Sequence, residues 1–128
     1  MPDKESYISK HWFEKADTDF ESAEILLSAE KLGPTAFHLQ QAIEKYLKGY
    51  LLGRGWNLKR THDLIDLLNE AVHYEPQFEK FRSLCGTATE YYVEDRYPFL
   101  ISSELNKEEL EKAVKDASAL IEFIKGID

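Results

Sequence analysis

The stretch FHLQQAIEKYLKGYL, residues 37–51, places its apolar residues with the period of an α-helix. At 100° per residue these side chains share one face. The face consists of Ala36, just before the stretch, and Leu39, Ala42, Ile43, Tyr46, Leu47 and Tyr50. A polar arc beside it consists of His38, Gln41, Lys45 and Lys48. Glu44 precedes Lys48 by four residues, a spacing that favours a surface ion pair on a helix. The arc is therefore either a solvated face or the border of an anion-binding groove.

Four other segments repeat apolar residues with a helical period, and none alternates convincingly like a strand. Together with the opening stretch they predict five helices, at residues 6–30, 33–52, 61 to about 75, 77–96 and from 106 onward. Pro34 suits the first turn of the second helix, and the NKEE sequence from Asn106 resembles a capping box. Because short connections join long amphipathic helices, we expect an all-α, antiparallel up-down bundle of four or five helices.

The whole chain has 128 residues and a formal net charge of −8. This length predicts one domain, residues 1–128, with a core of its own. The acidic balance argues against a broad basic surface for nucleic acid but leaves room for a local basic pocket. The basic cluster of note is GRGWNLKR, residues 53–60, and Trp56 within it is expected to be exposed. No apolar run has signal-peptide or membrane-spanning character, so we expect no membrane association and a cytoplasmic location.

Familiar motifs for catalysis, metals and cofactors are absent from the sequence. It contains no HExxH pattern, no G-x-G-x-x-G or phosphate loop, and no serine-hydrolase signature. The single cysteine, Cys85, excludes an internal disulfide and a cysteine-based zinc site. It falls on an apolar helical stripe, which predicts a core residue rather than a nucleophile. We therefore expect no catalytic residue, no metal site and no cofactor.

The turn RTHDL, residues 60–64, combines a helix start with two polar side chains. Thr61 is a good N-cap, and the helix dipole favours a carboxylate such as Asp63 in the first turn. His62 gains nothing from that dipole. Beside Arg60 and free backbone donors, it suits contact with a phosphate or with a buried polar group.

The segment EYYVEDRYP, residues 90–98, places a carboxylate at an unfavourable position. Asp95 follows Tyr92 by three residues and continues an apolar stripe, so we expect it to face the core in the last turn of a helix. Burial penalises a carboxylate there, and the helix dipole repels it. A cation from another element should compensate, and the candidates are Lys45, Lys48, Arg60 and His62. The result is either a structural salt bridge or a ligand site.

Taken in order, AFHLQQAIEKYLKGYLL, THDL and YYVEDRYP resemble the HEPN domain family of small prokaryotic helical bundles. The resemblance covers about residues 6–125 of the chain. It implies an antiparallel bundle of four or five helices, a homodimer, and association with nucleotides or RNA. It also implies a minimal nucleotidyltransferase as partner in a toxin–antitoxin-like pair, and ribonuclease activity in some members.

The ribonucleases of this family carry an Arg followed by a His after four to six intervening residues, and this chain lacks that spacing. Seven residues separate Arg54 from His62, and one separates Arg60 from it. No His follows Arg82 or Arg96. Without a paired His, an Arg can hold phosphate but has no evident means of moving a proton. We therefore expect a protein that is not itself an enzyme.

The leading hypothesis from the sequence is a non-catalytic nucleotide- or RNA-binding protein that works with a nucleotidyltransferase partner. Cationic side chains would meet phosphate, and Tyr92 or Tyr97 would stack on the ligand or hydrogen-bond to it. The predicted ligand-binding residues are Gln41, Lys45, Lys48, His62, Asp63, Tyr92, Asp95, Arg96 and Tyr97. Two alternatives stay open. One is a HEPN-type ribonuclease toxin with an atypical active site that uses Arg96 and His62, and the other is a protein-interaction module without a ligand.

Overall fold

The structure of the chain is a computed structural model that describes residues 4–92 and 105–128, with side chains from Ile8 onward. Its elements are α1 (Lys4–Ser28), α2 (Leu32–Gly53), α3 (Leu64–Tyr74), the 3₁₀-helix η1 (Pro76–Phe81), α4 (Arg82–Ala88) and α7 (Lys107–Ile127). No strand occurs in these two ranges. The expected all-α fold is therefore confirmed.

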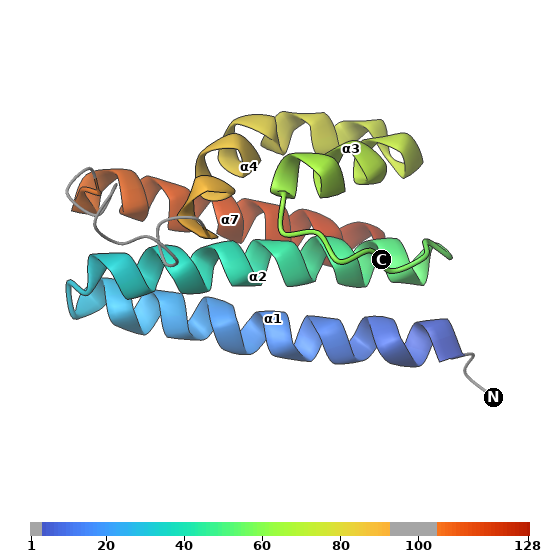
Figure 1. Ribbon diagram of the computed structural model, residues 1–128, viewed down its shortest axis with the longest axis horizontal. Coiled ribbons are helices and arrows are strands. Elements are labelled where there is room, and N and C mark those ends of the chain that lie inside the picture. The colour runs from blue at the N-terminus through green and yellow to red at the C-terminus, as the bar shows by residue number, and fades with distance from the viewer. Residues whose placement is uncertain (1–3, 93–104) are drawn as a thin grey trace.

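Helix α2 forms the centre of an antiparallel bundle (Figure 1). The chain reverses at residues 29–31, so α1 and α2 run side by side in opposite directions. Helix α7 lies along another side of α2. Helices α3 and α4 cover α2 from above in this view. Most residues of α2 from Thr35 to Leu52 are consequently buried, polar ones included.

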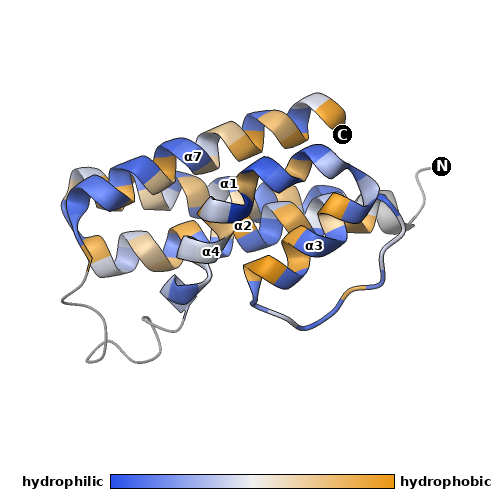
Figure 2. Ribbon diagram, turned by 90° about the horizontal axis from the view of Figure 1, so that it is seen from above, coloured by the Kyte–Doolittle hydropathy of each residue, from blue (hydrophilic) through white to orange (hydrophobic). Residues whose placement is uncertain are grey.

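The hydrophobic core lies between α2 and the helices that surround it. Its largest fully buried side chains include Phe78 of η1, Leu47 of α2 and Leu120 of α7. Figure 2 shows hydrophobic and hydrophilic segments alternating along α3 and α7, as expected of helices that bury one face. None of the described helices combines the length and the apolar character that crossing a membrane requires.

Residues 54–63, here called the connecting segment, join α2 to α3 without helix or strand and run back along the bundle (Figure 1). Gly55 has a φ of +89° at the start of this reversal, a conformation that glycine adopts at little cost. Because the segment folds back onto the bundle, Trp56 packs into the core and is only 7% exposed. The expectation that Trp56 is exposed is therefore wrong.

The start of α3 also differs from the expected one. The N-cap is Asp63, whose carboxylate accepts a hydrogen bond from the backbone N–H of Ile65 at 2.9 Å. Thr61, the expected N-cap, lies two residues before Asp63, and its hydroxyl oxygen accepts from the N–H of Asp63 at 3.1 Å. Asp63 takes the capping place because its carboxylate reaches the N–H groups of the first helical turn, which have no partner within the helix.

The expected continuous helix over residues 77–96 is divided in the structure. Pro76 opens η1, and the regular α-helix α4 begins only at Arg82. Proline suits this first position because its φ is pre-set and its missing N–H would have no partner in the helix. The last part of the expected helix, residues 93–96, lies outside the described residues.

Candidate functional site

A buried carboxylate, Glu44, lies midway along α2 and is 3% exposed. Its Oε2 accepts from the Lys48 ammonium at 2.9 Å, and Lys48 is itself 4% exposed. Its Oε1 accepts from Nε2 of Gln40 at 3.0 Å. These partners lie one turn on either side along the helix, so α2 itself supplies two of the donors that a buried carboxylate requires.

The connecting segment brings a third partner, His62, to the same carboxylate. Its Nδ1 lies 2.9 Å from Oε1 of Glu44, and its backbone carbonyl accepts from Gln40 Nε2 at 3.2 Å. The imidazole stacks on the ring of Tyr92, with centroids 4.2 Å apart and planes within 14°. The side chain is still 46% exposed. We call Gln40, Glu44, Lys48, His62 and Tyr92 the Glu44 cluster.

The Glu44 cluster is closed from the side of α1 by Trp12. The ammonium of Lys48 lies 5.5 Å from the centroid of the Trp12 ring, within range of a cation–π interaction. Lys48 therefore has a carboxylate on one side and an aromatic face on another. Lys48 is enclosed in this way, whereas His62 reaches the surface.

Chemically, the cluster holds an exposed imidazole in one orientation. A carboxylate at one ring nitrogen fixes the ring and its tautomer, as in sites where histidine binds anions or transfers protons. The parallel Tyr92 ring fixes the plane of the imidazole further. No group of three or more His, Cys, Asp or Glu side chains suited to a metal ion occurs among the described residues.

Several of the predicted ligand-binding residues meet in or beside this cluster. Lys48, His62 and Tyr92 belong to it, and Gln41 donates from Nε2 to Oε1 of Gln40 at 2.7 Å. Lys48 and His62 were two of the four cations expected near Asp95, and in the described part of the chain they meet Glu44. Asp95, Arg96 and Tyr97 lie outside the described residues.

Two of the predicted ligand-binding residues, Lys45 and Asp63, do not belong to the Glu44 cluster. Lys45 turns toward α1, where it pairs with Asp19, and the same carboxylate lies 3.0 Å from Nδ1 of His38. Asp63 is the N-cap of α3.

The carboxylate that organises the cluster, Glu44, and its neighbour Gln40 were missed by the sequence-based prediction. The available signal was the spacing of Glu44 and Lys48, for which a solvated face was one of two alternatives; burial of both side chains excludes that alternative for this pair.

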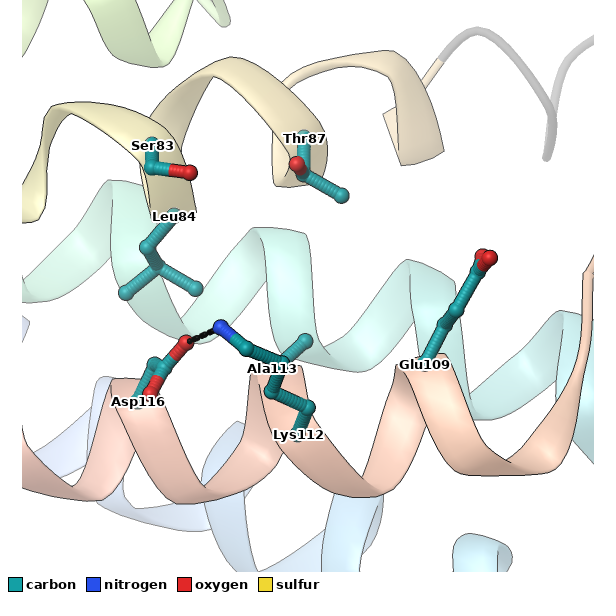
Figure 3. Close-up of a pocket in the computed structure, with 7 residues that line it drawn as sticks. All are labelled: Ser83, Leu84, Thr87, Glu109, Lys112, Ala113 and Asp116. Carbon is teal, nitrogen blue, oxygen red and sulfur yellow. Dashed lines mark hydrogen bonds and ion pairs between the residues drawn. The ribbon is translucent and has the colours of Figure 1, made fainter.

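A hollow of about 280 Å³ lies between α4 and α7 (Figure 3). Leu84 and Ala113 give it an apolar floor, and polar side chains surround it. Lys112 and Asp116 on its rim pair with each other at 2.8 Å along α7. This hollow has no buried charge comparable to Glu44, so the Glu44 cluster is the stronger candidate.

Known proteins share both the sequence pattern and the fold of this chain. A family model described as the HEPN domain matches residues 9–127. A Methanocaldococcus jannaschii protein named "Putative toxin MJ1304" is 29% identical over 132 residues, which cover 91% of this chain and 86% of that protein. The crystal structure of TT1696 from Thermus thermophilus matches with a TM-score of 0.78 and 26% identity, over 92% of this chain and 96% of that one.

Proposed function

Because this chain belongs to the HEPN domain family, we propose that it binds a nucleotide or RNA at the Glu44 cluster without itself being an enzyme. It works with a nucleotidyltransferase partner in a toxin–antitoxin-like pair. The toxin name of the Methanocaldococcus jannaschii relative supports the toxin-related part of this proposal. The partner and the binding function are expectations from the sequence resemblance, and the Glu44 cluster is the site that we propose for the binding function.

The observation that carries the proposal is the fixed and exposed imidazole of His62. Its Nδ1 lies 2.9 Å from Glu44, and its ring is stacked on Tyr92. In its protonated form the imidazole donates from Nδ1 to Glu44 and from the other ring nitrogen, Nε2, to a phosphate oxygen. A base can stack on the face of the His62 imidazole that is turned away from Tyr92. The expectation that Arg96, Asp95 and Tyr97 complete this site rests on the sequence alone.

The proposal is tested by calorimetric titration of a nucleotide panel into wild-type protein and His62→Ala. Hydrogen bonds to charged groups contribute about 1.5–3 kcal/mol, so we expect the affinity to fall by at least about tenfold. His73→Ala is the matched control, because His73 is exposed and contacts Tyr74 edge to face at 5.6 Å. Equal nucleotide affinity in wild type and His62→Ala would overturn the proposal.

The assembly part of the proposal concerns two partners, a second copy of this chain and the nucleotidyltransferase. The apolar side chains of Ile8 and Ile25 are exposed on α1 and are suited to a contact between copies. Light scattering of the purified protein should give the mass of a dimer. Co-expression with a nucleotidyltransferase encoded beside the gene should yield a complex that survives gel filtration. A monomer in the first experiment, or separate elution in the second, contradicts the corresponding part.

A ribonuclease is the second candidate function, and the contact between Glu44 and His62 favours it. A carboxylate that holds an imidazole is a common arrangement for general acid–base catalysis. Incubation of the purified protein with cellular RNA should then give cleavage that His62→Ala abolishes and His73→Ala retains. Intact RNA, or cleavage that continues in His62→Ala, excludes this function for the cluster.

A further inference from the structure

A second cluster of charged side chains lies where α2 meets α1. The carboxylate of Asp19 on α1 pairs with the ammonium of Lys45 and lies 3.0 Å from Nδ1 of His38. The Asp19 side chain is only 14% exposed, whereas 21% of Lys45 and 33% of His38 reach the surface. We call these three residues the Asp19 cluster. A largely buried carboxylate thus holds an imidazole and an ammonium here, as Glu44 does in its own cluster.

Both cations of the Asp19 cluster keep hydrogen-bond donors for a ligand. An ammonium has three donors, and among the described residues the ammonium of Lys45 is bonded to Asp19 alone. In its protonated form, His38 donates from Nδ1 to Asp19 and from Nε2 to another acceptor. Each side chain can therefore bind an anion without leaving Asp19.

A hollow of about 320 Å³ adjoins the Asp19 cluster. Lys15 on its wall is exposed and has no hydrogen bond or ion pair within the described part of the chain. Glu14 opposes an anion there, but with protonated imidazoles the cations in and beside the hollow outnumber the carboxylates. The hollow therefore suits a phosphate group. Its full lining is His11, Glu14, Lys15, Thr18, Asp19 and Lys45.

The Asp19 cluster and the Glu44 cluster border the same polar arc of α2. Lys45 follows Gln41 by four residues and precedes Lys48 by three. Residues at these spacings are neighbours on a helix, with Cβ atoms about 5–6 Å apart. Gln41 also donates to Gln40 of the Glu44 cluster at 2.7 Å. A ligand that lies along this arc can therefore reach both clusters.

We propose that the Asp19 cluster and its hollow hold a second phosphate of the ligand whose first phosphate meets His62. Single-stranded RNA presents successive phosphates, and proteins bind it with cationic grooves that follow its backbone. A nucleoside monophosphate has one phosphate and can occupy only one of the two clusters. This inference rests on the proposed function, and it deepens that function by naming single-stranded RNA as the ligand class.

The test is a calorimetric titration of AMP and of hexa-adenosine RNA into wild-type protein and variants. A contact to a charged group changes affinity about tenfold or more, so wild type should bind the RNA at least about tenfold more tightly than AMP. Lys45→Gln and Lys15→Gln should each weaken the RNA and leave AMP unchanged. Lys112→Gln is the matched control, because Lys112 also pairs with a carboxylate, at 2.8 Å, but on α7.

Salt dependence gives a readout that a partial loss of folded protein would not change. For single strands, the logarithm of the binding constant falls against the logarithm of salt concentration with a slope of about −0.7 per phosphate contact. The slope for the RNA should be shallower by about 0.7 in Lys45→Gln and unchanged in Lys112→Gln. Thermal melting establishes that Lys45→Gln is folded. Lys15→Gln gives an independent result because Lys15 is exposed.

ATP distinguishes the two sources of a further phosphate, because its three phosphates are joined directly to one another. We expect ATP to behave as AMP does, with an affinity that Lys45→Gln leaves unchanged. If ATP binds as tightly as the RNA and is weakened as much by Lys45→Gln, RNA as the ligand class is overturned.

His62→Ala separates this inference from the proposed function, because it should weaken AMP and the RNA by the same factor. Equal affinity of wild type for AMP and the RNA overturns the second phosphate site alone, as do RNA affinities in Lys45→Gln and Lys15→Gln that match Lys112→Gln. RNA binding that depends on Lys45 but not on His62, without AMP binding, upholds the second site and overturns the role of the Glu44 cluster. No binding of either ligand overturns both.

Discussion

At the scale of single residues, Glu44 shows what a helical wheel can and cannot predict. The spacing of Glu44 and Lys48 predicts that the two side chains are neighbours on α2, and they are, at 2.9 Å. The wheel does not predict burial, because burial depends on which other elements cover that side of the helix. Here the connecting segment returns along α2 and brings His62 onto Glu44. Two polar residues of α2 and one from beyond it thus come together at one carboxylate.

Replacement of Glu44 tests the strength of this buried contact. Glu44→Gln leaves the ammonium of Lys48 buried without its counter-charge. Removal of one partner from a buried ion pair destabilises a protein by about 3–5 kcal/mol, and we expect a loss of this order. Urea unfolding followed by circular dichroism measures it. The double variant Glu44→Gln/Lys48→Met should recover part of the lost stability, because no uncompensated charge then remains.

Asp116→Asn is the matched control for this charge removal. Asp116 and Lys112 form an ion pair with the same four-residue separation, but on the exposed surface of α7. Exposed pairs contribute little to stability, so this variant should unfold close to wild type. If Glu44→Gln loses no more stability than Asp116→Asn, the Glu44 pair is not effectively buried in solution.

At the scale of elements, the sequence predicts long helices better than it predicts the segments between them. For α2 and α7 the apolar period and the residues at the helix ends both indicate a helix over the same stretch. The Asn106 side chain caps α7 by accepting from Glu109 N–H at 2.8 Å. The connecting segment has no period, so its reversal and the burial of Trp56 could not be predicted. The candidate site was predictable only in part for the same reason: the spacing of Glu44 and Lys48 is a local signal, whereas the contact of His62 with Glu44 depends on the path of the connecting segment.

The packing of α1 against α2 depends on a glycine at their contact. A Cβ built on Gly49 would lie 2.9 Å from Cε1 of Phe13, too close for the ring to stay in place. The hydroxyl of Ser9 also donates to the Gly49 carbonyl at 2.6 Å. We expect Gly49→Ala to destabilise the fold by about 1–3 kcal/mol, as overpacking usually does. Thermal unfolding measures the change.

Gly33→Ala is the control for this element. Gly33 is also in α2, and a Cβ there would meet nothing within 4 Å. Alanine has the higher helix propensity, by about 0.8–1 kcal/mol in a helix interior, so Gly33→Ala should leave stability unchanged or raise it slightly. An equal effect of the two substitutions would mean that Phe13 does not restrict the α1–α2 contact.

At the scale of the whole molecule, burial around α2 changes how the fold responds to alkaline pH. Burial raises the pKa of the Cys85 thiol from 9.0 to about 12. It also raises the pKa of Tyr46, whose hydroxyl is hydrogen-bonded to Asp17, and the pKa of Tyr50. Each group is therefore harder to deprotonate in the folded protein than in the unfolded chain. All three lie in the one core cluster, so their effects on stability act on the same cooperative unit.

The sign of the resulting pH dependence follows from proton linkage. Below about pH 8 the Cys85 thiol is protonated in both the folded and the unfolded protein, so its contribution to the free energy of unfolding is fully present. Between about pH 9 and 12 the unfolded chain loses the Cys85 proton while the folded protein keeps it, so stability falls by up to about 1.4 kcal/mol per pH unit. Cys85→Ala removes this dependence. Urea unfolding at a series of pH values should show wild type and Cys85→Ala converging as the pH rises from about 8 to 10, because the tyrosines titrate later. Parallel curves would show that the folded core does not hold the thiol proton more tightly than the unfolded chain does.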